Sequence, residues 1–121
     1  MEGTEEYCRK FIQAGEIAFD QPDTMKEFID LANYSRRLGT YFKESDDLKE
    51  AGYYQIKALD MYQKIYDKTG SVDILEKLSD MYDIVVANRL SLGLDEEART
   101  FRAKARALSD EFAKIEGLRG D

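Results

Sequence analysis

Few side chains in this chain of 121 residues could do catalytic chemistry, and histidine is absent. Histidine is the only side chain whose unperturbed pKa lies near neutrality and the commonest metal ligand, so its absence removes most catalytic triads and zinc sites. Cys8 stands beside Arg9 and Lys10, but no histidine can activate it, and a structural thiol is the simpler interpretation. We therefore expect a protein that is not an enzyme and holds no cofactor or metal.

The carboxylates also favour structural roles. Glu76, Asp80 and Asp83 share one face of a helix and could attract a cation, but calcium prefers about six to eight oxygen ligands from a closed loop. A solvated acidic stripe is the simpler interpretation. Asp46 and Asp47 stand where a helix is expected to begin, so they oppose the positive end of its dipole rather than act as a glycosidase pair.

The balance of charge excludes two classes of partner. The formal net charge is −7 and the isoelectric point is about 4.7, so phosphate backbones and anionic lipid surfaces would repel the chain. A 43% share of hydrophobic residues is enough to bury a core. With one cysteine and no secretory signal pattern, we expect a cytoplasmic location and neither nucleic acid nor membrane as a partner.

The elements that must position the polar residues are all predicted to be helices. Pro22 is the only proline, and apolar residues recur at spacings of three and four along most of the chain. Gly, Ser, Asp and Pro at the breaks are typical helix ends and starts. The sequence predicts an all-α fold, in one domain over residues 1–121, with five antiparallel helices near 4–19, 23–44, 46–68, 72–92 and 95–116.

The chain also repeats itself at a shift of 47 residues. The shift superposes identical residues at these pairs: Leu31 and Leu78, Glu50 and Glu97, Ala51 and Ala98, Lys57 and Lys104, Ala58 and Ala105. Continued backwards, it places Tyr7 under Tyr54, so the first helix looks like a third copy of the second helix of each pair. A period of this length indicates stacked helical hairpins.

At these residues the sequence resembles the tetratricopeptide repeat family. The family's Leu-Gly pair, the aromatic residue after it and two small residues a heptad apart are similar to Leu38, Gly39, Phe42, Ala51 and Ala58. The resemblance covers residues 24–116, and the period is longer than the family's usual value of about 34 residues, consistent with extra helical turns.

The second unit is degenerate. It keeps residues similar to the family pattern at Tyr82, Gly93, Ala98 and Ala105, while Val86 replaces the glycine and Arg89 the aromatic. The resemblance implies a right-handed superhelical array in which the first helix of each pair, 23–44 and 72–92, lines a concave peptide-binding surface. It also implies a scaffold for protein-protein interaction without catalysis.

The same resemblance implies which side chains face the groove. They lie on the polar face of each first helix, opposite its apolar stripe. The stripe of the first unit is basic overall and that of the second is acidic: Lys26, Asn33, Arg36, Arg37, Thr40 and Lys43, then Asp73, Glu76, Asp80 and Asp83. Arg36 and Asn33 could bind a carboxylate, while Asp80 and Asp83 bind a basic side chain. Alternatively, the two stripes pair with each other or remain solvated.

A second hypothesis assigns the chain a structural role. The helix at 4–19 carries a broad apolar arc that includes Phe11, Ile12 and Phe19. Such an arc could bind a second copy of the chain, and the protein would then be a self-associating helical domain with no specific peptide ligand.

Overall fold

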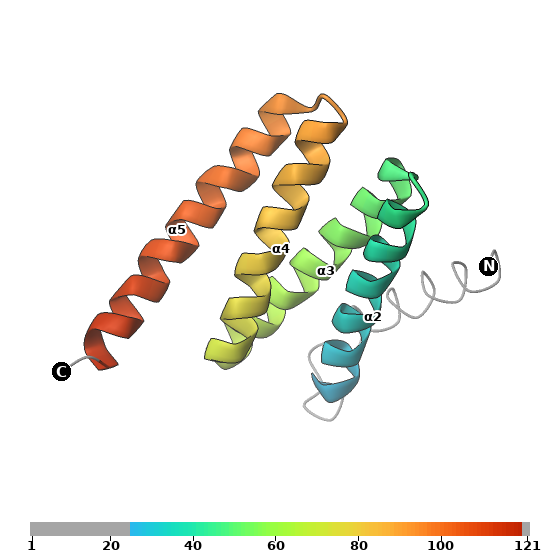
Figure 1. Cartoon of the computed structure of the whole chain (residues 1–121). Helices are drawn as coiled ribbons and strands as arrows, with labels where there is room; N and C mark the ends of the chain where they lie inside the picture. The colour runs from blue at the N-terminus through green and yellow to red at the C-terminus, as the bar shows by residue number, and fades with distance from the viewer. Residues whose placement is uncertain (1–24, 120–121) are drawn as a thin grey trace.

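A computed structural model describes residues 25–119, and all of the regular structure in this range is helical (Figure 1). The helices are α2 (Met25–Glu44), α3 (Leu48–Thr69), α4 (Val72–Ser91) and α5 (Asp95–Arg119). The expected all-α fold is therefore confirmed, and the last four expected helices match to within a few residues. Four helices are described rather than five, because the expected helix at 4–19 lies outside the described residues.

The helix ends follow from the residues at the three turns. Asp47 begins α3, and its carboxylate accepts a hydrogen bond of 3.2 Å from the backbone N–H of Glu50. Ser71 begins α4 in the same way, with Oγ accepting from the N–H of Ile74. Gly70 ends α3 at a φ of 64°, a left-handed conformation in which a residue without Cβ is unstrained.

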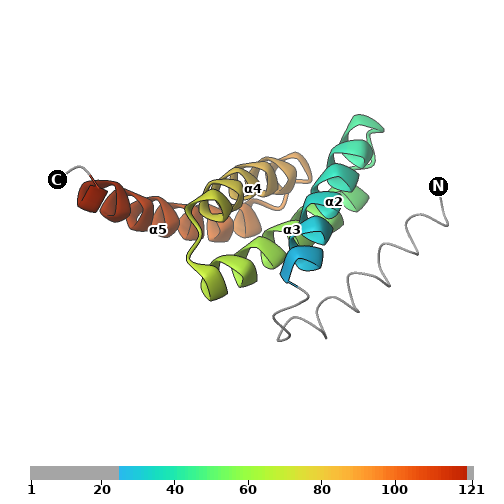
Figure 2. The same cartoon turned by 90° about the horizontal axis from the view of Figure 1, so that it is seen from below.

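The helices form an open array rather than a closed bundle. Each helix packs mainly against the next one in the sequence. In Figures 1 and 2, α2 and α5 lie at opposite ends with α3 and α4 between them, and Figure 2 shows α2 and α4 along one side and α3 and α5 along the other. The arrangement leaves the surfaces of α2 and α4 on the same side of the molecule.

The core lies where the apolar stripes predicted it. The apolar stripe of α2 is buried at every position: Phe28, Leu31, Ser35, Leu38, Gly39 and Phe42. Phe42 stacks on Tyr54 of α3, with ring centres 5.6 Å apart. Ala51 and Ala58 of α3, two of the repeated residues, have no exposed surface.

The correspondence is weaker at the end of the array. Ala98 is buried like its counterpart Ala51, whereas Ala105 is only half-buried although Ala58 is fully enclosed. Among the described helices, α5 has extensive contacts only with α4. The side of α5 that faces away from α4 is therefore exposed to solvent. The two repeat units are therefore equivalent in sequence register but not in burial.

Two glycines allow helices to approach closely. A Cβ atom on Gly39 of α2 would lie 2.7 Å from Cγ of Gln55 and 3.4 Å from the backbone oxygen of Ala51. A Cβ atom on Gly52 of α3 would meet Asn88 and Arg89 of α4. Neither position leaves room for a side chain without a shift of its neighbours.

Candidate functional site

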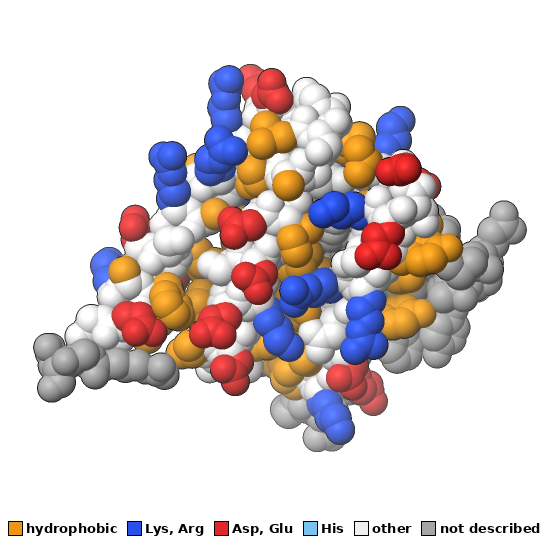
Figure 3. Space-filling model, in the orientation of Figure 1, with side chains coloured by type: hydrophobic (Ala, Val, Ile, Leu, Met, Phe, Trp, Pro, Cys, Tyr) orange, Lys and Arg blue, Asp and Glu red, His pale blue; other side chains and the backbone are white. Residues whose placement is uncertain are grey.

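The surface shared by α2 and α4 carries opposite charges side by side. Figure 3 shows lysine and arginine side chains gathered between the two helices and aspartate and glutamate side chains along α4. No hydrogen bond or ion pair between the predicted basic residues of α2 and the predicted acidic residues of α4 is found in the part of the chain that the structure describes. The two stripes therefore do not neutralise each other through direct contacts.

Part of the predicted set forms an open pocket of about 430 Å³, which we call the basic pocket. It is lined by four side chains of α2 and one of α4: Asn33, Arg36, Arg37, Thr40 and Lys77. The residues of α2 lie at spacings of three, one and three, so they occupy one broad face of the helix. Three of the five carry a positive charge and none carries a negative one.

Asn33 organises the floor of the basic pocket. Its Oδ1 accepts hydrogen bonds from the hydroxyl of Tyr62 on α3 and from Nζ of Lys77, the latter at 3.4 Å. These two bonds hold the side-chain amide of Asn33 in place, and both use its Oδ1 as the acceptor. Burial raises the pKa of Tyr62, while the positive charges of Arg36 and Arg37 lower it to a smaller extent. The phenol therefore remains a neutral donor at neutral pH.

The cations of this pocket have no carboxylate partner in the described part of the chain, although Lys77 donates a hydrogen bond to Asn33. Arg36 and Lys77 are half-buried and Arg37 is exposed, and within the described residues no ion pair involves any of them. Three cations that converge without a carboxylate raise the local potential in a chain whose net charge is −7. Two guanidinium groups can bind a carboxylate or a phosphate through charge-assisted hydrogen bonds.

A second pocket of about 310 Å³ lies toward the C-terminal ends of α2 and α4, and we call it the acceptor pocket. Its lining comes from three helices: Lys43, Leu48, Gln55, Asp83, Ile84, Ala87, Asn88 and Ser91. Gln55 is only 2% exposed, and its Oε1 has no hydrogen-bond partner among the described residues. Leaving such a buried acceptor unpaired costs free energy in the folded state.

The predicted site residues are thus divided. Asn33, Arg36, Arg37 and Thr40 meet in the basic pocket, and Lys43 and Asp83 meet in the acceptor pocket. The remaining four are exposed and line neither pocket: Lys26, Asp73, Glu76 and Asp80. Phe11, Ile12 and Phe19, predicted for self-association, lie outside the described residues.

Sequence reasoning missed other residues that line these pockets, Lys77 and Gln55 among them. Lys77 follows Glu76 directly, and only the rotation of α4 turns it toward α2. Gln55 belongs to α3, and it reaches the acceptor pocket because Gly39 and Ala51 let its helix come close. Neither has a sequence signal beyond its place on a helix.

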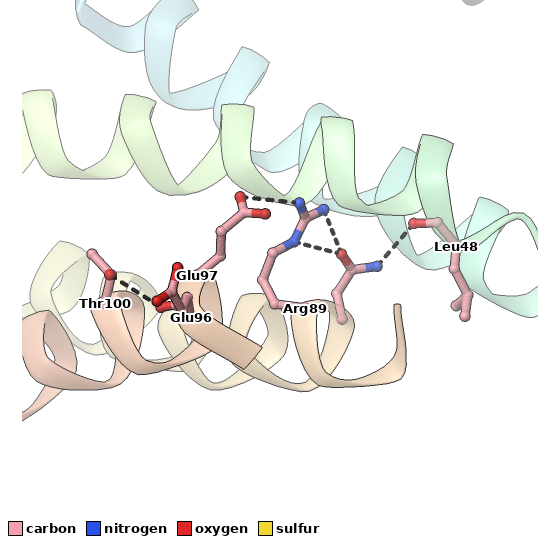
Figure 4. A network of polar contacts seen from close by, with 6 residues as sticks. Leu48, Arg89, Glu96, Glu97 and Thr100 are labelled. Atoms are coloured by element: carbon pink, nitrogen blue, oxygen red, sulfur yellow. Dashed lines mark hydrogen bonds and ion pairs between the residues drawn. The ribbon is translucent and has the colours of Figure 1, made fainter. Parts of the chain in front are cut away.

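A polar network holds the acceptor pocket in shape (Figure 4). Asn88 donates from Nδ2 to the backbone oxygen of Leu48 at 2.9 Å, and its Oδ1 accepts from Nε and Nη2 of Arg89 at 3.1 and 2.7 Å. Arg89 also lies 3.6 Å from a carboxylate oxygen of Glu97. The network joins α3, α4 and α5, and it occupies both ends of the Asn88 amide.

A third hollow, of about 380 Å³, lies between α3 and α5 on the other side of the array. Two of its polar lining residues have tyrosine partners, because Tyr82 donates to Oε1 of Gln63 at 3.3 Å, and Tyr66, outside the lining, donates to Glu111 at 2.8 Å. This contact with Glu111 is also the main cause that raises the pKa of Tyr66.

Comparison with protein-family models, with curated proteins and with solved structures gave no match for this chain. Among the described residues, no helix has the length and apolar character needed to cross a membrane. The same residues contain no group of three or more cysteine or acidic side chains placed to hold a metal ion.

Proposed function

We propose that this protein is a non-catalytic interaction module that binds a peptide or protein segment along the surface between α2 and α4. The observation that carries the proposal is the basic pocket, in which Arg36, Arg37 and Lys77 converge without a carboxylate among the residues that line it. A segment with an acidic group would supply the missing charge. The site needs no cofactor.

We also propose that the array is built like a tetratricopeptide repeat, with α2 and α4 as the groove-lining helices of a right-handed superhelix. Three contacts support this. Gly39 lies against the backbone of Ala51, Phe42 stacks on Tyr54, and Ala58 is fully enclosed. These are positions that carry the resemblance in the first unit.

The acidic residues of α4 support a ligand that binds across α2 and α4 in one orientation. Asp73, Glu76 and Asp80 are exposed along α4, beyond the basic pocket. A segment with acidic and basic residues on opposite edges would meet both charges, and a uniformly acidic one would be repelled by α4. Exposed charges act through screened attraction, so binding should be strongest at low salt.

A charge reversal tests the proposal. The double variant Arg36→Glu with Arg37→Glu is compared with Arg99→Glu with Arg102→Glu, which makes the same change of charge on exposed positions of α5. Both are applied to an array of immobilised peptides at low and high salt. We expect the α2 variant to lose binding of acidic peptides that the parent and the α5 variant retain, with a smaller difference at high salt.

Thermal unfolding of the three proteins accompanies the binding assay, so that loss of fold is recognised. Parent protein that binds no peptide, or equal loss in the two variants, would show that the α2–α4 surface is not the binding site.

A further inference from the structure

The basic pocket presents accessible hydrogen-bond donors to a ligand. Arg36 and Lys77 are half-buried and Arg37 is exposed, and all three line the pocket. Guanidinium and ammonium groups donate hydrogen bonds but accept none. A ligand group that suits them is therefore an acceptor, and three positive charges favour an anion.

Contacts across the pocket bring the cations toward one another. Nζ of Lys77 on α4 donates to Oδ1 of Asn33 on α2 at 3.4 Å, so the ammonium is directed toward α2. The hydroxyl of Tyr62 donates to the same oxygen. Burial raises the pKa of Tyr62, and the charges of Arg36 and Arg37 lower it, so both guanidinium groups are close enough to act on this hydroxyl. The three cations therefore lie around the side chain of Asn33.

The neutral side chains of the pocket offer few acceptors. Oδ1 of Asn33 already accepts from Tyr62 and Lys77, which leaves the N–H groups of its Nδ2 as donors. Thr40 uses its hydroxyl proton in a hydrogen bond of 3.2 Å to the backbone oxygen of Arg36. Among the described residues that line the pocket, the hydroxyl oxygen of Thr40 is the one side-chain acceptor left. An occupant that brings only acceptors therefore matches the lining.

The number of cations favours a phosphate over a carboxylate. A carboxylate has one negative charge on two oxygens, and it would leave two of the three cations of the pocket without a counter-charge. A phosphorylated side chain carries about −1.5 to −2 charges at neutral pH on three terminal oxygens. It can accept charge-assisted hydrogen bonds from α2 and α4 at the same time.

The charges around the pocket disfavour a phosphate that belongs to a polyanion. The chain has a net charge of −7, and Asp73, Glu76 and Asp80 are exposed along α4. A nucleic acid or an anionic membrane would bring many further negative charges against this helix. A single phosphate on an otherwise neutral or basic peptide segment reaches the cations without that repulsion.

We infer that the basic pocket binds a phosphorylated side chain of the ligand segment, with Arg36 and Arg37 of α2 and Lys77 of α4 donating to the phosphate oxygens. The inference rests on the proposed function, since it names the chemical group that occupies the same site. It also goes further, because an unmodified acidic residue would satisfy the proposed function. Phosphorylation of the segment would then switch binding on.

Matched peptides test the inference on the full chain. An acetylated and amidated peptide has one variable position, which is phosphoserine, glutamate or serine, between flanks of glycine, alanine and lysine. The lysines prevent repulsion by α4, and the serine peptide measures their own contribution. Binding is followed by titration of the backbone amide NMR signals of the protein.

We expect the phosphoserine peptide to bind the parent about tenfold more tightly than the glutamate peptide, the effect of one further charge-assisted hydrogen bond. Both should bind more tightly than the serine peptide. Equal binding of the phosphoserine and glutamate peptides, above that of serine, would overturn the inference and leave the proposed function standing. If neither binds better than the serine peptide, both proposals are refuted.

Substitutions test the position of the phosphate. Arg36→Gln and Lys77→Gln each remove one cation of the pocket and should weaken phosphoserine binding about tenfold. Arg102→Gln and Lys114→Gln make the same changes at exposed positions of α5 and should have almost no effect. Arg37→Gln, at an exposed position, replaces Arg36→Gln if a thermal melt shows that the latter is unfolded. Binding that is retained in the pocket variants would overturn the inference.

Other phosphate carriers are tested by competition. Inorganic phosphate, a single-stranded DNA oligonucleotide and vesicles that contain phosphatidylserine are each added to the complex of the parent with the phosphoserine peptide. We expect none of them to displace the peptide at an equal concentration of phosphate groups, because none combines one phosphate with basic neighbours. Displacement by any of the three under this condition would overturn the assignment to a phosphorylated peptide.

Discussion

Gly52 of α3 and Asn88 of α4 are so close that a Cβ atom on the glycine would lie 2.5 Å from Oδ1 of Asn88. The same atom would lie 2.2 Å from Nη2 of Arg89. The Arg89 end is flexible, but Asn88 is held by its bond to the backbone of Leu48. The missing side chain of Gly52 therefore allows the polar network between α3, α4 and α5 to form.

Gly52→Ala should destabilise the protein for this reason. We expect a loss of about 1 to 3 kcal/mol in the free energy of unfolding, the usual cost of overpacking a core. Gly117→Ala is the matched control, because a Cβ atom there has no neighbour within 4 Å. At this exposed helical position alanine should stabilise by about 0.5 to 1 kcal/mol. Chemical denaturation of both variants measures the effects, and equal stability would contradict the prediction.

The sequence predicted the helices and the core because these depend on local rules. Gly70 ends α3 and Ser71 begins α4 through local geometry that does not depend on the tertiary structure, and the apolar stripe of α2 is buried as its spacing indicated. The pockets depend instead on how the helices are rotated. Lys77 enters the basic pocket although its neighbours Glu76 and Asp80 do not, and no local pattern distinguishes it from them.

The buried amides of Gln55 and Asn88 should respond differently to substitution. Gln55 Oε1 has no hydrogen-bond partner among residues 25–119, so Gln55→Met removes no hydrogen bond from this oxygen there and should keep or raise the melting temperature. Asn88 is 6% exposed and makes three hydrogen bonds, to Leu48 and Arg89. Asn88→Leu should therefore cost about 1 to 3 kcal/mol.

Thermal melts of the two amide variants, made under the same conditions, check this contrast. A larger loss in Gln55→Met than in Asn88→Leu would contradict the prediction and show that the Gln55 amide is an essential part of the folded core.

Alkaline pH should destabilise the fold through its buried tyrosines. Burial is the main cause that raises the pKa of Tyr62 and of Tyr82 above 10.0, and Asp60 and Asp67 raise that of Tyr82 further. Above pH 10 the unfolded chain releases these protons while the folded chain retains them. Stability is therefore fully present below pH 10 and is lost as the pH rises through the folded pKa values.

Tyr62→Phe isolates part of this effect. The variant loses the bond to Asn33, so its melting temperature at pH 8 should fall, by an amount that corresponds to about 1 kcal/mol. Its further decrease between about pH 8 and 11 should be smaller than in the parent, because one buried phenol no longer titrates. Circular dichroism melts across this range give the melting temperature of the parent and of Tyr62→Phe as a function of pH. The same pH dependence in both proteins would contradict the prediction.

Self-association and peptide binding make opposite predictions for two substitutions. If the apolar arc of residues 4–19 binds a second copy, Ile12→Glu should convert an assembled species to monomer, since a charge buried at such a contact is costly. The double reversal at Arg36 and Arg37 should leave assembly unchanged, because these residues line a basic pocket on α2. Sedimentation of the parent and both variants gives the mass of each. A monomeric parent whose peptide binding depends on the arginines supports the interaction module, while an assembled parent that responds only to Ile12→Glu supports the structural role.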